Sequence, residues 1–389
     1  MKIAFFSNFL NHHQLPFCLA MQRLTNDQFV FVATTPTPAD RLSMGYHDMN
    51  KHYAFVLTTY DSEENEKKAM ELALNCDVII TGSAPEKYTR ERIKRNRITF
   101  RYSERPYKQG IARAYRPRNI VSWMRHHTRY AFKPLYMLCA SAYTAFDHSL
   151  LGAYVGKTYK WGYFPEVKEQ DLDALFARKR NNVRPKILWV ARLLPLKHPE
   201  AAVETARFLK EQGKQFDMDI IGNGEMEEEL KAMIRTQGLE DCVRLLGSMS
   251  PEAVREHMEQ ADIFLFTSDF NEGWGAVLNE SMNSACAVVA SHAIGSVPFL
   301  MRDGENGLVY KNGDTADLCR KVLRLVEEPN ERERMGREAY QTLAQVWNAD
   351  AAAERFLKLA EDLQTGKKSA RFAEGPCSPA EIMRNGWYK

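Results

Sequence analysis

Short apolar runs alternate with segments of helical periodicity along this chain, and that alternation limits the folds open to it. It is most regular in the second half. The apolar runs that we predict as strands there are residues 186–191, 217–221, 243–246, 263–266 and 287–290. Strands connected through a helix run parallel, because the helix returns the chain to the starting end of the sheet. The second half is therefore predicted to be a doubly wound parallel α/β sheet.

A less regular alternation in the first half predicts a second domain of the same kind. Strands are expected there at residues 2–7, 29–33, 53–57, 78–80 and 136–141. A chain of 389 residues, 44% of them hydrophobic, can bury two cores, and two domains imply a cleft. We predict a first domain at 1–165 and a second at 166–374, beginning with a charge-dense crossing. The tail, 375–389, is expected to return to the first domain, with Trp387 and Tyr388 packed on it.

Two basic residues, Arg192 and Lys197, follow the first strand of the second half. Ligands of doubly wound sheets bind beyond the carboxyl ends of the strands, so both side chains could reach a bound group. Arginine offers a planar pair of donors and lysine a compact charge, which together suit a departing diphosphate. The alternative is that both are solvated side chains of a surface loop.

Glycine turns follow the next two strands at the same predicted edge, and backbone groups there could recognise a nucleotide base. The positions concerned are Gly222, Gly224 and Gly247, with Ser248 and Met249 after the last of them. A lone Gly-x-Gly is weak evidence, however. An ordinary strand-to-helix turn explains these residues as well.

Residues 264–291 form the most informative stretch, which we predict as strand, polar loop, helix and strand. Glu272 lies in the loop, and Glu280 lies inside a helix expected to begin near Gly275. Gly273 and Gly275 let the backbone approach a bound group, and the free N–H groups of a first helical turn stabilise an anion. The two carboxylates are suited to accept hydrogen bonds from sugar hydroxyls on either side of a phosphate. The stretch therefore predicts a seat for an activated sugar.

These features, taken in order, resemble the donor-binding half of glycosyltransferase family 4, the retaining transferases of GT-B architecture. The likeness covers residues 186 to about 346 and includes Glu272 and Glu280, with seven residues between them and Glu-Gly-Trp-Gly inside the motif. It implies two Rossmann-like domains that face a central cleft. It further implies that Arg192 and Lys197 hold the donor diphosphate, that Glu280 binds the ribose, and that Glu272 with the 273–275 backbone reads the sugar. Trp274 and Ala276 complete the donor-side candidates.

The resemblance also implies a mechanism. Family members retain the anomeric configuration without an evident protein nucleophile, and the departing diphosphate is thought to accept the acceptor's proton. No metal and no cofactor is expected, and the donor is a nucleotide-diphosphate sugar, with a UDP-sugar favoured. One departure is the segment 295–299, Gly-Ser-Val-Pro-Phe, which lacks the acidic residue that the family often has there.

The first domain carries less of the likeness, and its candidates face the acceptor. His12 and His13 stand where many family members have glycines, and one of them is expected to touch the donor or the acceptor. Helix capping or packing is the alternative. Glu104 could orient an acceptor hydroxyl, although a structural salt bridge explains it as well. The further acceptor-side candidates are Asn11, Arg101 and Arg105.

Residues 87–133 hold fifteen Lys or Arg against two acidic residues, with aromatic residues interleaved. Such a segment suits an anionic membrane, an acidic acceptor or nucleic acid, and part of it could be a solvated face. We favour the membrane surface over nucleic acid. The seven cysteines are scattered without metal-ligand spacing, which indicates a reducing compartment. The predicted location is the cytoplasm, peripheral to the inner face of the cytoplasmic membrane.

The resulting hypothesis is a retaining glycosyltransferase that adds a sugar to a glycan or to a polyprenyl-diphosphate-linked saccharide in cell-surface polysaccharide biosynthesis. A GT-B nucleotide-sugar epimerase is one alternative, and it would not need a wide basic face. A non-catalytic protein that binds nucleic acid or membrane is the other, and the intact set Arg192, Lys197, Glu272 and Glu280 argues against it.

Overall fold

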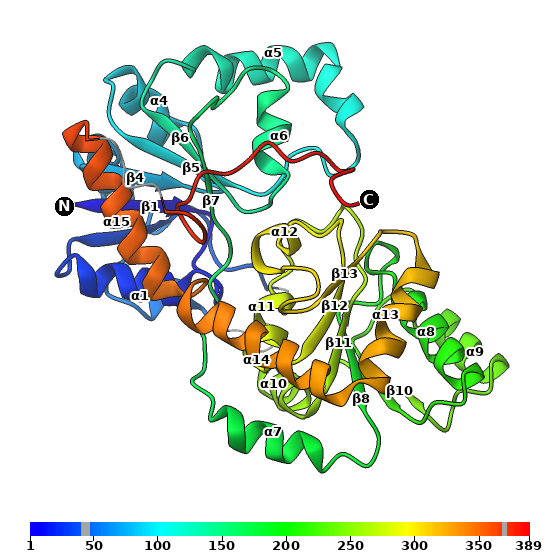
Figure 1. The fold of residues 1–389 in the computed structure, drawn as a ribbon. Helices are drawn as coiled ribbons and strands as arrows, with labels where there is room; N and C mark the ends of the chain where they lie inside the picture. Colours follow the sequence, from blue (N-terminus) through cyan, green and yellow to red (C-terminus); the bar gives the residue numbers. More distant parts are fainter. Residues whose placement is uncertain (40–46, 368–371) are drawn as a thin grey trace. The chain divides into compact units, whose positions relative to one another are not determined.

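The computed structural model describes residues 1–39, 47–367 and 372–389, which divide into two compact units. Unit 1 comprises Met1–Glu166 and Trp347–Arg384, and unit 2 comprises Val167–Val346 and Asn385–Lys389. Each unit is built on one wholly parallel sheet with helices on both faces (Figure 1). The predicted pair of doubly wound α/β domains is therefore confirmed.

The sheet of unit 1 has the strand order β3-β2-β1-β4-β5-β6-β7. Its strands are β1 (Ile3–Ser7), β2 (Phe29–Ala33), β3 (Val56–Thr58), β4 (Val78–Thr81), β5 (Thr99–Ser103), β6 (Leu135–Cys139) and β7 (Thr158–Lys160). Its helices are α1 (Leu15–Leu24), α3 (Glu63–Asn75), α4 (Lys87–Lys94), α5 (Pro117–His126), α6 (Thr144–Ser149) and α15 (Ala349–Thr365). β1 and β4 are wholly buried, as expected for central strands covered on both faces.

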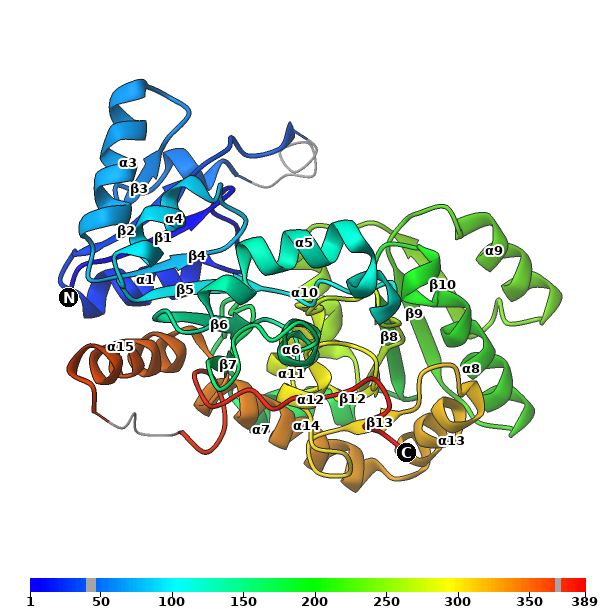
Figure 2. The same cartoon turned by 90° about the horizontal axis from the view of Figure 1, so that it is seen from above.

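The sheet of unit 2 has the order β10-β9-β8-β11-β12-β13. Its strands are β8 (Lys186–Val190), β9 (Asp217–Ile221), β10 (Val243–Gly247), β11 (Ile263–Phe266), β12 (Ala287–Ser291) and β13 (Leu308–Tyr310). Its helices are α7 (Leu172–Arg180), α8 (Pro199–Glu211), α9 (Glu227–Thr236), α10 (Pro251–Gln260), α11 (Val277–Asn283), α12 (Val297–Leu300), α13 (Thr315–Glu327) and α14 (Pro329–Gln345). α8 and α13 lie side by side on one face of this sheet (Figure 2).

The order of unit 2 reverses between β8 and β11, so the loops that follow these two strands leave the same edge on either side of the reversal. Ile263 of β11 pairs with Ile187 of β8 and with Ala287 of β12. Such a reversal is where doubly wound sheets bind ligands. The register therefore places the Arg192–Lys197 and Glu272 segments at the topological switch point.

Two predictions about the C-terminal segment were wrong. α15 belongs to unit 1, where the Phe356 ring lies among those of Phe17, Phe100 and Trp161, so the return to unit 1 begins at Trp347 and not at residue 375. Trp387 and Tyr388 belong to unit 2. Tyr388 stacks on His292 and accepts a hydrogen bond of 2.7 Å from Lys321 Nζ. Both corrections depend on tertiary packing, which the order of the elements along the chain does not reveal.

The basic segment 87–133 was expected to form a surface, but part of it lies in the interior of unit 1. It contains β5, which was not predicted, and Arg92, whose buried guanidinium donates to backbone carbonyls of Ala73, Cys76, Asp77 and Ile98. Among the described residues, no helix is both long and apolar enough to cross a membrane.

Candidate functional site

The loop after β8 is held against the loop after β9 by backbone contacts that require glycine. Leu193 N donates to Asn223 O at 2.8 Å, and Gly222 and Gly224 have φ values of 142° and 157°. A Cβ on Gly222 would lie 1.9 Å from Ala191 O, and one on Gly224 would lie 2.4 Å from Leu193 O. The Gly-x-Gly therefore has a structural reason, namely the close approach of the two loops.

Lys197 and Glu272, which lie 75 residues apart in sequence, form an ion pair in which Lys197 Nζ donates to Glu272 Oε2. Both side chains are largely buried, with 16% and 13% exposed. Ser268 Oγ donates to the same carboxylate oxygen at 3.0 Å. The structure thus brings together two of the predicted residues, one from each loop at the switch point.

The hydroxyl of Thr267 anchors the backbone of this pair. Trp189 Nε1 donates to Thr267 Oγ1 at 2.8 Å, and the hydroxyl lies 2.6 Å from Lys197 O and 3.0 Å from His198 O, to either of which it can donate. Asp269 N donates to Leu196 O at 3.0 Å. The β8–α8 loop is therefore tied to the segment after β11 by its backbone as well as by the Lys197 side chain.

Arg192 is exposed, and within residues 1–39, 47–367 and 372–389 its guanidinium has no hydrogen bond or ion pair. This contrasts with Lys197, which is already paired. An arginine without a partner at the carboxyl edge of a sheet keeps all its donors available for an anion.

The loop from Thr267 to Ala276 is fixed by a buried tryptophan. The Trp274 side chain is fully buried, donates from Nε1 to Asn279 Oδ1 at 2.8 Å and lies beside the Phe299 ring. The side chain therefore packs in the interior, and the predicted donor contact of Trp274 through its backbone stays a prediction. Gly275 has a φ of 79°, and a Cβ there would lie 2.3 Å from the Phe266 ring. The following helix, α11, begins at Val277, after the predicted start near Gly275.

Glu280 lies in the first turn of α11 and is partly exposed. Desolvation raises the pKa of its carboxyl above the ordinary value, and the positive charge of Arg255 opposes that rise. Two cations hold the far end of this helix: Arg255 Nη1 donates to Asn283 Oδ1 at 2.7 Å, and Lys179 Nζ donates to Ser284 O and Ala285 O at 2.9 Å each. Cations at a helix C-terminus are favourable, so α11 is firmly placed.

The predicted base-recognising positions follow β10. Gly247 has a φ of 70° and accepts a hydrogen bond of 2.8 Å from Gly222 N. Ser248 is exposed, Met249 is half-buried, and Ser250 caps α10 by accepting from Ala253 N. The predicted base-recognising edge of the sheet therefore runs without interruption from Gly222 to Met249. Along this edge, Arg192 lies between these residues and Glu272.

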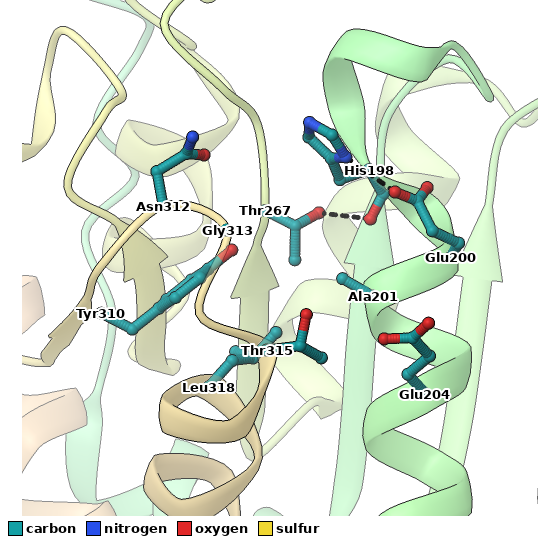
Figure 3. Close-up of a pocket in the computed structure, with 10 residues that line it drawn as sticks. All are labelled: His198, Glu200, Ala201, Glu204, Thr267, Tyr310, Asn312, Gly313, Thr315 and Leu318. Carbon is teal, nitrogen blue, oxygen red and sulfur yellow. Dashed lines mark hydrogen bonds and ion pairs between the residues drawn. The ribbon is translucent and has the colours of Figure 1, made fainter.

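A pocket of about 180 Å³ lies next to the Lys197 loop, between α8, β13 and α13 (Figure 3). It was not predicted. His198 and Glu200 line one wall, joined by a hydrogen bond of 2.7 Å between Nδ1 and Oε1, and Tyr310 and Asn312 line the opposite wall. Glu204 makes the pocket acidic, which does not suit a phosphate.

The predicted residues of the β1–α1 loop in unit 1 have structural partners. Asn11 Oδ1 accepts from the backbone N–H groups of His13 and Gln14 at 3.0 and 3.1 Å, so it shapes the turn before α1. The His13 ring stacks on Tyr163 with centroids 5.3 Å apart, and its carbonyl accepts from Phe164 N. The His12 ring lies beside that of His13. These contacts agree with the packing alternative and leave a substrate role as a prediction.

Three other acceptor-side candidates are engaged in the structure of unit 1. Glu104 accepts from Tyr163 OH and Lys108 Nζ at 2.5 Å each, which is the salt-bridge alternative. Arg105 is buried and paired with Asp147 at 3.1 Å, so its expected role toward the acceptor was wrong. Arg101 is 12% exposed and donates to His126 O, Glu86 and Tyr154, which likewise makes it structural. A buried charge needs such partners.

Sequence reasoning missed four residues that position the pair: Trp189, Thr267, Ser268 and Asp269. Thr267, Ser268 and Asp269 directly follow β11, and that place in a doubly wound sheet was the signal that could have identified them.

Comparison with known proteins agrees with this arrangement. Residues 173–342, under half of the chain, match the family model described as Glycosyl transferases group 1. The chain is 38% identical over 145 residues to the amylovoran biosynthesis glycosyltransferase AmsK of Erwinia amylovora, covering 36% of this chain and 35% of that protein. It is 29% identical over 195 residues to the alpha-D-kanosaminyltransferase of Streptomyces kanamyceticus, covering 49% and 50%. The chain thus matches between about a third and a half of these relatives' lengths.

Solved structures match over nearly the whole chain. Anabaena HepE in complex with UDP gives a TM-score of 0.69 at 16% identity, covering 94% of this chain and 100% of that one. Its complex with UDP-glucose gives 0.62 at 17% identity, covering 92% and 99%. The lipopolysaccharide outer core galactosyltransferase WaaB gives 0.63 at 15% identity, covering 94% and 99%. At these identities the likeness shows the fold alone. The chain has the GT-B fold of two Rossmann-like domains, and residues 173–342 match the Glycosyl transferases group 1 family.

Proposed function

We propose that this protein is a retaining glycosyltransferase that moves a sugar from a nucleotide-diphosphate sugar to a saccharide acceptor in cell-surface polysaccharide biosynthesis. The observation that carries the proposal is the ion pair between Lys197 and Glu272 at the switch point of unit 2, beside the unpaired Arg192. The named relatives, such as the amylovoran transferase, support the same class. UDP is the favoured nucleotide, because the similar HepE structures hold UDP and UDP-glucose.

In this proposal the donor diphosphate is bound by Arg192 and by Lys197, which exchanges Glu272 for phosphate. Glu272, once released, accepts hydrogen bonds from the donor sugar, together with the backbone of Gly273, Gly275 and Ala276. Glu280 binds the ribose. The base lies along the edge formed by Gly222, Gly224, Gly247, Ser248 and Met249. Lys197 is a suitable phosphate ligand, because its ion pair with Glu272 already orients its charge in the site before the phosphate replaces that carboxylate.

The reaction follows from the leaving group. The bond between the anomeric carbon and the diphosphate oxygen breaks, and the acceptor hydroxyl attacks from the same face. Its proton moves to the departing diphosphate, so no protein nucleophile and no metal is required. Arg192 and Lys197 stabilise the charge that develops on the diphosphate, which is where such groups contribute most. His12 or His13 is proposed to contact the substrates.

The acceptor is proposed to be lipid-linked and the enzyme peripheral to an anionic membrane. Five large apolar side chains of unit 1 are exposed between residues 111 and 132, among unpaired arginines. We call these residues the α5 surface: Ile111, Tyr115, Val121, Met124 and Phe132, with Arg113, Arg116, Arg118 and Arg125. In the described part of unit 1, none of these arginines pairs with an acid, and no acidic residue lies between Glu104 and Asp147. Aliphatic side chains beside arginine suit a bilayer interface better than nucleic acid.

Product analysis tests the proposed reaction. The protein is incubated with each UDP-, GDP- and ADP-sugar, with and without a lipid extract that contains polyprenyl-diphosphate saccharides. A transferase yields a lengthened lipid-linked glycan only when extract is present, and the anomeric coupling of the new linkage reports retention. Conversion of the donor sugar without extract would instead indicate an epimerase, and no product in either case would contradict the proposal.

Vesicle sedimentation tests the membrane position separately. The protein should sediment with vesicles containing phosphatidylglycerol and remain in solution with neutral vesicles. Replacing Arg116, Arg118 and Arg125 by Glu should abolish sedimentation, because each basic residue near an anionic surface contributes about 1 kcal/mol. The matched control replaces Arg90, Lys94 and Arg95, basic residues of the same unit outside the α5 surface, and should still sediment. Equal sedimentation of both variants would contradict the assignment.

A further inference from the structure

The side chain of His198 links the two loops of the candidate site, in addition to the pair between Lys197 and Glu272 and the backbone contacts made by Thr267 and Asp269. Its Nδ1 lies 2.7 Å from Glu200 Oε1 on α8, and its Nε2 lies 3.7 Å from Asp269 Oδ2 in the segment after β11. The imidazole therefore stands between a carboxylate of its own helix and a carboxylate of the loop that carries Glu272.

The backbone of His198 has an uncommon conformation. Its φ and ψ are 50° and 55°, the left-handed conformation, directly before the first turn of α8. Histidine, asparagine and aspartate adopt this region more often than other residues with a β-carbon, so the conformation is compatible with a histidine at this position. Figure 3 shows the imidazole at the mouth of the acidic pocket, turned toward Glu200.

The two links differ in what donor binding does to them. If the proposed function is correct, the donor diphosphate takes Lys197 from Glu272, and the side-chain tie between the loops at that point is lost. The tie through His198 and Asp269 involves neither residue and can persist. Because Lys197 and His198 are adjacent, holding His198 also limits the movement of Lys197 while it changes partner.

We propose that His198 is a positioning residue that holds the Lys197 loop against the Glu272 loop while a sugar-nucleotide diphosphate is bound. The inference rests on the proposed function. It requires no contact between His198 and the donor, since both ring nitrogens of His198 face carboxylates of this chain, those of Glu200 and Asp269.

The protonation state of His198 should therefore be coupled to donor affinity. The charged and titratable groups around the imidazole are Glu200 and Glu204 of α8, Asp269, the adjacent Lys197, and Tyr310 at the end of β13. The hydrogen bond to Glu200 raises the pKa of His198 above its ordinary value, with burial acting in the opposite direction. The imidazolium, which attracts both carboxylates, therefore persists to a higher pH than that of an unperturbed histidine, and it is lost as the pH rises through the raised pKa.

Calorimetric titration of the full chain with UDP-glucose between pH 5.5 and 8.5 tests the proposal, because this diphosphate diester keeps a constant charge over that range. The wild-type affinity should fall by about two- to fivefold across the range, the effect of losing one partly exposed ion pair. The variant His198→Asn should bind at every pH with the low affinity of the wild type at pH 8.5, because asparagine tolerates the left-handed backbone but carries no charge. The control His257→Asn removes another histidine–carboxylate pair of unit 2, to Asp219 at 3.4 Å, and should keep the wild-type profile.

A measurement without donor separates this inference from the proposed function. Histidine NMR titration of the free protein should give a raised pKa for His198 that falls in Asp269→Asn. Failure of the wild type to bind any nucleotide sugar would overturn the proposed function, while the NMR titration would still show whether His198 and Asp269 interact. A pH profile of His198→Asn that matches the wild type, or a His198 pKa unchanged in Asp269→Asn, would overturn the positioning role.

Discussion

Two histidines of unit 1, the buried His148 and the half-buried His127, should make it sensitive to acid. His148 is fully enclosed among the rings of Trp123, His127 and Tyr154, and no hydrogen-bond partner for either of its ring nitrogens lies in the described part of the chain. Burial lowers the pKa of His148 to about 3. Burial, with the positive charge of Arg101, lowers the pKa of His127 to about 2.

The direction and size of the effect follow from these values. In the unfolded chain both imidazoles become protonated below about pH 6.5, whereas in the folded unit they stay neutral. The unfolded state then binds more protons, so the free energy of unfolding falls as the pH drops from that value toward the folded pKa values. Between pH 6.5 and 4.5, each histidine costs about 2.3 kcal/mol, or about 4.6 kcal/mol for the pair. That loss is comparable with the whole stability of many domains.

The assay is urea unfolding at pH 7 and pH 4.5, followed through tryptophan fluorescence of unit 1. Carboxylate titration contributes equally to variants, so comparing variants isolates the histidine. The substitution His148→Phe should reduce the difference in unfolding free energy between the two pH values by about 2.7 kcal/mol, since phenylalanine cannot be protonated. His52→Asn, at an exposed histidine of the same unit, should leave it unchanged. If His148→Phe unfolded with the wild-type pH dependence, the reasoning would be refuted.

Three further predictions concern packing. Gly222→Ala should destabilise unit 2 by several kcal/mol, because the new Cβ would collide with Ala191 O. Gly247→Ala, whose Cβ would have nothing within 4 Å, should cost only about 1 kcal/mol of left-handed strain. Thermal unfolding compares the two variants, and equal losses of stability would contradict the close approach of the two loops. Phe356→Ala should lower the stability of unit 1 by about 3–5 kcal/mol in urea unfolding, as expected for a buried ring, and a change within error would refute the assignment of α15 to unit 1. Lys179→Met should destabilise unit 2 by about 1–3 kcal/mol in the same assay, because Ser284 O and Ala285 O lose a buried donor, and unchanged stability would contradict this role.

Much of the fold was predictable because central parallel strands are continuous apolar runs. β2 and β11 were predicted at their observed bounds for this reason, since both lie in sheets covered on both faces. β5 was missed because it contains Arg101 between Phe100 and Tyr102, which reads as part of a basic surface. The membership of α15 could not be predicted, because it depends on tertiary contacts, such as those of Phe356 with Phe17 and Phe100, that the sequence of the helix does not reveal.

The site was predictable where it depends on position in the sheet and unpredictable where it depends on partners. Lys197 and Glu272 follow neighbouring strands, so their proximity follows from topology. Arg105 could not be distinguished from an exposed arginine, because its partner Asp147 lies 42 residues away. The packing role of Trp274 depends likewise on its hydrogen bond to the buried side chain of Asn279, and the sequence motif gives no information on which side chains are buried.

The central claim is that Arg192 binds the diphosphate of a nucleotide sugar in unit 2. Arg192 is exposed, and its side chain makes no hydrogen bond or ion pair within the described residues, so Arg192→Ala should change the unfolding free energy by less than about 0.5 kcal/mol. The decisive measurement is calorimetric titration of UDP-glucose into the wild type, Arg192→Ala and the control Arg207→Ala, whose residue lies on the exposed side of α8. The account predicts that Arg192→Ala weakens binding at least about tenfold, the contribution of one charge-assisted contact, while Arg207→Ala binds as the wild type does. Equal affinity of Arg192→Ala and the wild type would contradict it.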